Sequence, residues 1–249
     1  DEPVFVGFRE GMQQLTEGLV RSLAGSDIRT GASVHAIELG QSGLRVFGDT
    51  KSTEADAVIL TAPAHQAAEI LQTSSQASER LSSIEHASVV LVTMGFKSSD
   101  VGNSLNGSGM LIPRNSGFLT TAVSWGSSKW RHWDDGEHVI LRVSAGRAGD
   151  TRALALDDNE LVEALLTEVA QILKIEGNLV EWRVSRWIDA FPQYAPGHDR
   201  LVTAIERDLR TAMPGIYIAG AGYKGLGIPA CINQGKLAAK SALDYLGTL

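Results

Sequence analysis

Residues 215–246 have the sequence GIYIAGAGYKGLGIPACINQGKLAAKSALDYL, which predicts a short strand, a glycine-rich turn and a helix. The apolar residues 216–219 form the expected strand. The turn that follows contains four glycines, Gly220, Gly222, Gly225 and Gly227. Pro229 stands where a first-turn proline is tolerated, and apolar residues recur beyond it at helical spacing. Such a succession points free backbone N–H groups and the positive end of a helix dipole at an anionic or electron-rich ligand.

Residues 220–225, GAGYKG, match the G-x-G-x-x-G dinucleotide pattern but not its usual context. That fingerprint is followed by a second strand that carries an acidic residue about 20 positions later. Here one helix follows the turn, so no βαβ unit is completed and we do not interpret the turn as a Rossmann opening. On spacing alone, a glycine-rich connection that packs a helix on a sheet is about as well supported as a ligand site.

The composition limits the classes of protein that fit the chain. Its 249 residues, 43% of them hydrophobic, suffice for one large domain or two small ones. The net charge of −7, without a dense Lys/Arg run, argues against a nucleic-acid partner. The single cysteine excludes an intrachain disulfide and suits a reducing compartment. No apolar run predicts a membrane-spanning helix, and residues 1–15 do not resemble a signal peptide.

Taken whole, residues 215–235 resemble the C-terminal flavin motif of the oxygen-dependent protoporphyrinogen oxidases, which belong to the FAD-dependent amine-oxidase-like group. The family pattern is roughly G-[VIL]-[YF]-[LIM]-x-G-x-x-[YF]-x-G-[VL]-[GA]-[IV]-x-x-C-[IV]-x-x-G, and this stretch follows it nearly throughout. A second specific match is AFPQYAPGH at residues 190–198, which is similar to the family's A-x-P-Q-Y-x-x-G-H. Weaker similarity extends back to Gly11, where Glu10 replaces the first glycine of the family's usual pair.

The strand and helix patterns, together with this resemblance, predict a mixed α/β and α+β fold. We expect a partial FAD/NAD(P)-binding domain and a substrate-binding domain built on an antiparallel sheet flanked by helices. The expected boundaries are residues 1–83 for one FAD-binding segment, 84–190 for the substrate-binding domain and 191–249 for a C-terminal FAD-binding segment. Family members begin with a G-x-G-x-x-G turn for the FAD pyrophosphate. None is present here, so we expect the chain to be the C-terminal half of a longer protein.

The resemblance implies FAD as the cofactor and assigns it six residues, Val34, Trp187, Gly220, Leu226, Gly227 and Ile228. Val34 would lie against the adenine, and Trp187 would lie near the flavin ring. The backbone N–H groups of Leu226, Gly227 and Ile228 would meet the pyrimidine edge of the flavin, where a helix dipole favours negative charge. From the residues alone, Trp187 is more often a large core residue.

The resemblance also places three residues, Met94, Leu111 and Ile112, on strands that line a tetrapyrrole pocket. From the residues alone, an apolar side chain on a strand is more often part of the core. The basic group that pairs with a substrate propionate usually lies in the N-terminal half of family members, so no residue here takes that role from the resemblance.

The sequence offers no catalytic residue and no metal site. Its histidines and Cys231 have no partner at ligand spacing, and no pair stands out as general acid and base. His198 is expected to be structural. A flavin carries its own redox chemistry, so a flavoprotein needs no such pair.

The resemblance implies an FAD-dependent protoporphyrinogen or coproporphyrinogen oxidase of heme biosynthesis. Such an enzyme removes six electrons from a porphyrinogen and passes them to O2, giving hydrogen peroxide. The chain alone is expected to be inactive without the N-terminal half of the FAD domain. Two alternatives stay open: another flavin amine oxidase or desaturase, and a non-catalytic module that binds a porphyrin or a partner chain. The resemblance implies a cytoplasmic protein, and peripheral membrane contact and oligomeric state are open.

Overall fold

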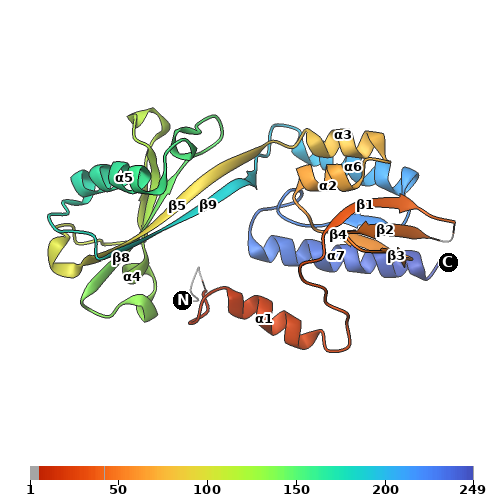
Figure 1. Cartoon of the computed structure of the whole chain (residues 1–249), viewed down its shortest axis with the longest axis horizontal. Helices are drawn as coiled ribbons and strands as arrows, with labels where there is room; N and C mark the ends of the chain where they lie inside the picture. The colour runs from red at the N-terminus through yellow and green to blue at the C-terminus, as the bar shows by residue number, and fades with distance from the viewer. Residues whose placement is uncertain (1–5, 42, 249) are drawn as a thin grey trace. The chain divides into compact units, whose positions relative to one another are not determined.

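The computed structural model describes residues 6–41 and 43–248. Its contacts divide the chain into two compact units, residues 1–32 and 33–249, each of which is described by itself. The first unit contains the helix α1 (Gln13–Ser22), whose side chains are all at least partly exposed. Helices and strands are mixed throughout the second unit (Figure 1), which confirms the predicted fold class.

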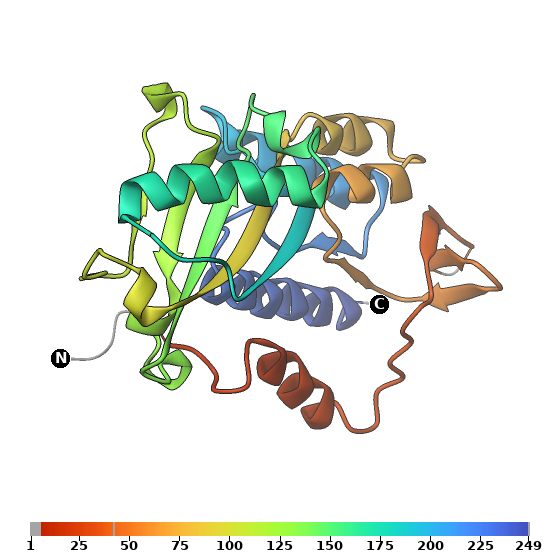
Figure 2. The ribbon, with the colours of Figure 1, turned by 60° about the vertical axis from the view of Figure 1, so that its left-hand side comes forward.

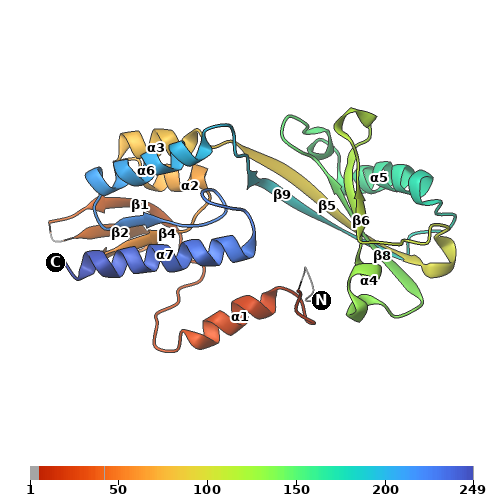
Figure 3. The same ribbon diagram turned by 180° about the vertical axis from the view of Figure 1, so that it is seen from behind.

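One part of the second unit combines two small sheets with four helices. The strands β1 (Val34–Leu39), β2 (Leu44–Gly48) and β3 (Ser52–Ala55) form an antiparallel sheet in that order. The strands β4 (Val58–Leu60) and β10 (Ile216–Ile218) pair in parallel. The helices are α2 (Ala64–Ile70), α3 (Ser75–Ser82), α6 (His198–Ala212) and α7 (Ile228–Leu246). Helix α7 packs beside β4 and β10 (Figure 3), so the strand, turn and helix predicted at residues 215–246 are confirmed.

The other part is a five-stranded antiparallel sheet. Its strands, in spatial order, are β6 (Gly109–Leu111), β7 (Thr120–Trp125), β8 (His138–Ala145), β5 (His86–Lys97) and β9 (Glu181–Pro192). Four short 3-10 helices, η1 (Ser98–Asp100), η2 (Arg114–Ser116), η3 (Arg131–Trp133) and η4 (Arg152–Leu154), and the short α4 (Gly126–Lys129) lie in its connections. The long helix α5 (Asp158–Leu173) covers one face of the sheet (Figure 2).

Helix α5 begins at a capping box formed by Asp157 and Glu160. The side chain of Asp157 accepts hydrogen bonds from the backbone N–H groups of Asn159 and Glu160, at 2.8 and 2.9 Å. In return, the carboxylate of Glu160 accepts the backbone N–H of Asp157 at 3.0 Å. This reciprocal arrangement satisfies donors that a helix start otherwise leaves free. The capping box thereby fixes the residue at which α5, the helix that covers the sheet, begins.

The two faces of the five-stranded sheet differ in chemistry because side chains alternate along a strand. On β5, the side chains of Val90, Val92, Met94 and Phe96 are fully buried beneath α5. The residues between them point to the opposite side and are partly exposed. We call this opposite side the open face.

The second unit has two separate hydrophobic cores. One is built from residues between 37 and 84 and between 202 and 223, and the other from residues between 90 and 175. The first core draws on the two segments predicted to bind FAD, and the second lies within the segment predicted to bind the substrate. The domain boundaries at residues 83 and 190 stay a proposal.

The helices described for this chain include none that combines the length and the apolarity needed to cross a bilayer.

Candidate functional site

The glycine turn, residues 219–227, follows β10 at the carboxyl end of the parallel β4–β10 pair. Gly220 and Gly225 have φ values of 137° and 122°, which residues with a side chain rarely adopt. A Cβ atom on Gly225 would lie only 2.7 Å from the Cβ of Ala230, in the first turn of α7. Open α/β sheets bind ligands in the crevice beyond the carboxyl ends of their strands. The glycine turn has that position.

The turn is also packed against the connection between β4 and α2. Tyr223 is buried, and its hydroxyl lies 3.5 Å from the carbonyl oxygen of Ala62. Burial raises the pKa of Tyr223 well above its usual value, so the phenol stays protonated. A Cβ on Gly222 would come 3.6 Å from the Cβ of Ala64. The ends of two strands that lie far apart in the sequence therefore meet at this turn.

Gln234 holds the turn from the side of α7. This buried side chain accepts the backbone N–H groups of Gly220 and Lys224, at 3.4 and 3.3 Å, through Oε1. Its Nε2 donates to the carbonyl oxygen of Gly225 at 3.4 Å. One amide thus ties the turn to the helix that follows it.

The AFPQYAPGH motif holds the same turn from another side. The hydroxyl of Tyr194 donates to the carbonyl oxygen of Ala221 at 2.6 Å and accepts the N–H of Gly225 at 2.9 Å. Its ring stacks on that of His198, with centroids 3.9 Å apart and planes 11° apart. Nε2 of His198 lies 2.8 Å from the carbonyl oxygen of Tyr223. His198 is buried and bonded, so the prediction that it is structural is confirmed.

We expect Tyr194→Phe to lower the free energy of unfolding by about 1–2 kcal/mol, because two hydrogen bonds of the turn are lost. Burial raises the pKa of Tyr194, so the phenol keeps the proton that it donates. The measurement is urea unfolding followed by circular dichroism. Tyr217→Phe on β10 is the control, since its hydroxyl has no hydrogen bond within the described part of the chain. Equal stability of both variants would show that the Tyr194 bridge contributes nothing.

The start of α7 completes the turn. Gly227 occupies the N-cap, and no side chain caps the first N–H groups of the helix. These groups have no partner within a helix, so they are available to a ligand. Leu226 and Ile228, on either side, are 53% and 47% exposed. Gly220, Leu226 and Gly227 thus lie in the glycine turn, and Ile228 follows it directly. The Gly220 N–H is bonded to Gln234, whereas the N–H groups of Leu226, Gly227 and Ile228 have no acceptor among the described residues. This environment fits an electron-rich ring edge such as that of a flavin.

The other two predicted cofactor residues lie in different sheets. Val34 is exposed at the start of β1, opposite Gly48. Trp187 lies on β9 opposite Val89, on the open face, and is 51% exposed. This exposure argues against the core interpretation of Trp187. A cofactor role for either residue stays a prediction.

The three predicted substrate residues do not share one face. Leu111 ends β6 on the open face and is 84% exposed, and the next residue, Ile112, is partly buried. Met94 is 0% exposed and lies beneath α5 on the opposite side of the sheet. Its side chain has no surface to offer a ligand, so we correct its assignment from pocket residue to core residue. The assignments of Leu111 and Ile112 stay predictions.

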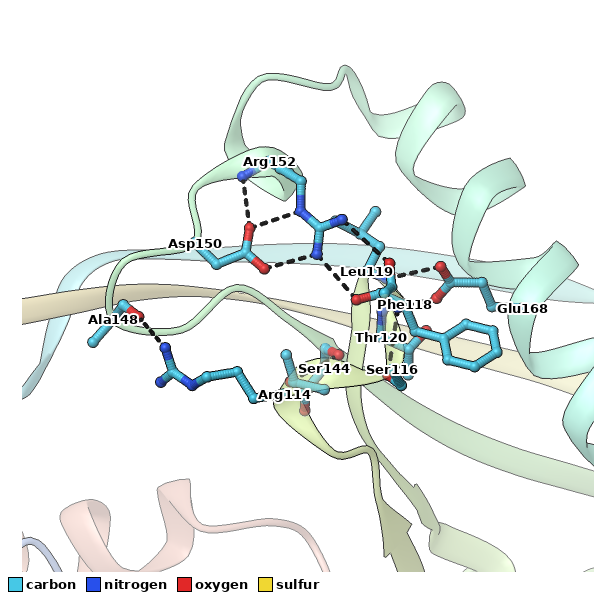
Figure 4. Close-up of polar contacts among 12 residues, drawn as sticks. Arg114, Ser116, Phe118, Leu119, Thr120, Ser144, Ala148, Asp150, Arg152 and Glu168 are labelled. Atoms are coloured by element: carbon cyan, nitrogen blue, oxygen red, sulfur yellow. Dashed lines mark hydrogen bonds and ion pairs between the residues drawn. The ribbon is translucent and has the colours of Figure 1, made fainter.

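Polar contacts fix the residues that lead into β7 (Figure 4), the strand with which Leu111 of β6 pairs. The carboxylate of Glu168 on α5 accepts the backbone N–H groups of Leu119 and Thr120, at 2.7 and 2.8 Å. The guanidinium of Arg152 donates to the carbonyl oxygen of Phe118 at 3.0 Å and pairs with Asp150. This pairing lowers the pKa of Asp150 to about 2.

Two features of the site were not predicted. Tyr194 and Gln234 were not assigned a role in shaping the turn, although a tyrosine within a specific motif is the kind of residue that offers a polar contact from an apolar body. Arg142 was also missed, although a lone arginine within the apolar run VILRVSA, residues 139–145, is an unusual signal. Within residues 6–41 and 43–248, no cluster of three or more His, Cys, Asp or Glu is arranged to hold a metal.

Comparison with known proteins agrees with the family resemblance found in the sequence. Residues 1–243 match the family model described as flavin containing amine oxidoreductase. A coproporphyrinogen III oxidase of Bacillus subtilis is 35% identical over 237 residues, which cover 95% of this chain and 50% of that protein. Several further curated relatives carry the same name. The chain therefore spans about half the length of the curated relatives that it matches.

Solved structures similar to this chain are also about twice its length. A crystal structure from Exiguobacterium sp. 255-15, provisionally described as a protoporphyrinogen oxidase, matches with a TM-score of 0.87 and 28% identity, over 98% of this chain and 54% of that one. Cyclohexylamine oxidase from Brevibacterium oxydans matches with a TM-score of 0.73 and 17% identity, over 95% of this chain and 53% of that one. At that identity, the second likeness concerns the fold alone.

Proposed function

Because the chain belongs to the flavin containing amine oxidoreductase family, we propose that it forms part of an FAD-dependent porphyrinogen oxidase of heme biosynthesis, with coproporphyrinogen as the favoured substrate. The observation that carries the cofactor part of this proposal is the glycine turn. It is held on two sides, by Gln234 and by Tyr194, and leads into the uncapped start of α7.

In the proposed site, the N–H groups of Leu226, Gly227 and Ile228 would bind the pyrimidine edge of the flavin. The positive end of the α7 dipole would stabilise negative charge there. Trp187 would lie near the ring and Val34 near the adenine. Bound FAD would supply the electron acceptor, while this chain would bind and orient it.

The open face of the five-stranded sheet would take the porphyrinogen. A wide, flat and largely apolar substrate fits a surface with exposed apolar side chains such as Leu111 and few polar anchors. In the overall reaction, the porphyrinogen loses six electrons and six protons in three steps. Three molecules of O2 accept them and become three molecules of hydrogen peroxide, so the reaction balances without another oxidant.

We assign the complete porphyrinogen oxidase activity to this chain acting together with a second segment, equivalent to the half of the relatives that this chain does not match. That part would supply the FAD pyrophosphate site. Alone, the chain is expected to bind FAD weakly or not at all and to turn over nothing. The proposal includes the segments 1–83 and 191–249 for FAD, the segment 84–190 for the substrate, and a cytoplasmic location.

The test is a chimera in which the unmatched part of the Bacillus subtilis enzyme is joined to this chain. With FAD and air, the chimera should convert coproporphyrinogen III into fluorescent coproporphyrin III, with hydrogen peroxide formed in threefold amount. The chain alone should give no more coproporphyrin than the spontaneous oxidation of coproporphyrinogen by air.

A chimera that holds FAD and oxidises cyclohexylamine but not the porphyrinogen would favour an amine oxidase. A chimera that binds porphyrin without FAD would favour a non-catalytic module.

A further inference from the structure

Arg142 lies near the middle of the open face. On β8 it is directly opposite Ser124 of β7 and Thr93 of β5. Thr93 is in turn opposite Arg183 of β9, so the two arginines share one row across the sheet. Strands in a sheet are about 4.8 Å apart, which places the two backbones roughly 10 Å from each other.

The two arginines differ in their electrostatic surroundings. Arg183 donates two hydrogen bonds to the carboxylate of Glu181, at 3.1 and 2.9 Å, and is thereby neutralised. Arg142 is exposed and forms no ion pair or side-chain hydrogen bond with any residue that the structure describes. It is an uncompensated cation in a chain with a net charge of −7.

The neighbours of Arg142 on β7, β8 and β5 are apolar or neutral, and the charged pair Arg183–Glu181 lies one strand further away, on β9. The adjacent row contains Leu111, Ala122, Ser144 and Leu91 in register across four strands. Ile140 lies two residues before Arg142 on the same side of β8. Positive charge in a flat, mostly apolar surface is complementary to a flat ligand that carries an anionic group at its edge.

We propose that Arg142 binds a propionate carboxylate of the tetrapyrrole and selects substrates that carry more than two such groups. This inference rests on the proposed function. Coproporphyrinogen has four propionates, whereas protoporphyrinogen has vinyl groups in place of two of them. A guanidinium pairs with a carboxylate through two parallel N–H donors. Arg142 therefore favours the tetracarboxylate when it faces an edge of the macrocycle at which the dicarboxylate carries vinyl groups.

The test is porphyrin binding to the whole chain, measured by quenching of tryptophan fluorescence. The probes are coproporphyrin III, with four carboxylates, and mesoporphyrin IX, with two. We expect Arg142→Gln to weaken coproporphyrin III binding about tenfold, the scale of one lost charged contact, and mesoporphyrin IX binding less than about threefold. Arg142→Lys should recover part of the loss. The control is Arg45→Gln, an exposed arginine paired with Glu54 on the β1–β2–β3 sheet, which should change neither affinity.

Three results would overturn the inference: unchanged coproporphyrin III binding by Arg142→Gln, equal weakening of both porphyrins, and failure of the unsubstituted chain to bind coproporphyrin III. None of them decides the proposed function, which is judged separately by coproporphyrin formation in the chimera. Active chimeras with and without Arg142→Gln that show the same preference between the two porphyrinogens would likewise overturn only the role of Arg142.

Discussion

Gly225→Val should prevent FAD uptake by the chimera and lower the free energy of unfolding of the chain by about 2–5 kcal/mol. A φ of 122° at a residue with a side chain costs about 1–3 kcal/mol. The added atoms would also meet Ala230, whose Cβ is 2.7 Å from the position of a new Cβ, and overpacking costs a further 1–3 kcal/mol or so. The turn cannot shift freely because Tyr194 and Gln234 both bond to Gly225.

The measurements are urea unfolding of the chain and FAD retention of the chimera after gel filtration. The control for unfolding is Gly235→Ala, in the middle of α7, where a Cβ would meet nothing within 4 Å. It should stabilise the chain by about 0.5–1 kcal/mol, since alanine favours a helix more than glycine does. A Gly225→Val variant as stable as the original chain, with its FAD retained in the chimera, would contradict the described geometry.

Glu168→Ala is expected to lower the free energy of unfolding by about 2–4 kcal/mol. Hydrogen bonds to a charged group contribute about 1.5–3 kcal/mol each, and the substitution leaves the N–H groups of Leu119 and Thr120 without their acceptor. Thr120 is fully buried, so water reaches its N–H poorly. The connection between β6 and β7 should loosen as a result.

Urea unfolding and amide hydrogen exchange at Leu119 and Thr120 check this expectation. The matched control is Glu163→Ala, one and a half turns earlier on the same helix, whose exposed carboxylate has no hydrogen bond to the described residues. It should change stability by less than about 0.5 kcal/mol. If the two variants unfold alike and exchange alike, Glu168 does not hold the start of β7.

The local elements were predictable because their signals are local. The strand, glycine turn and Pro229 at residues 215–246 define β10 and the start of α7, and Asp157 marks the start of α5. The resemblance of the same residues to a flavin motif identified the family, which the comparisons confirm. Each of these conclusions depends on residues within about one helix length of each other.

Contacts across long separations were not predictable from the residues. Tyr194 bonds to Gly225, 31 positions later, and nothing in the motif AFPQYAPGH states its partner. The face on which a strand residue lies depends on register, and a shift by one residue exchanges the two faces. This explains why Met94 and Leu111 looked equivalent in the sequence although one is buried beneath α5 and the other is exposed on the open face. The same register places Arg142 on the open face.

FAD titration is the decisive measurement for the proposal that this chain carries one part of a divided flavin site. Tryptophan fluorescence would be followed for the chain alone and for its mixture with the unmatched part of the Bacillus subtilis enzyme, with Trp187→Phe as the variant that reports on the ring. We predict no saturable uptake by the chain alone, saturable uptake by the mixture, and a smaller quenching signal in Trp187→Phe. Tight uptake by the chain alone would contradict the division of the site, and no uptake in either condition would contradict the flavoprotein assignment itself.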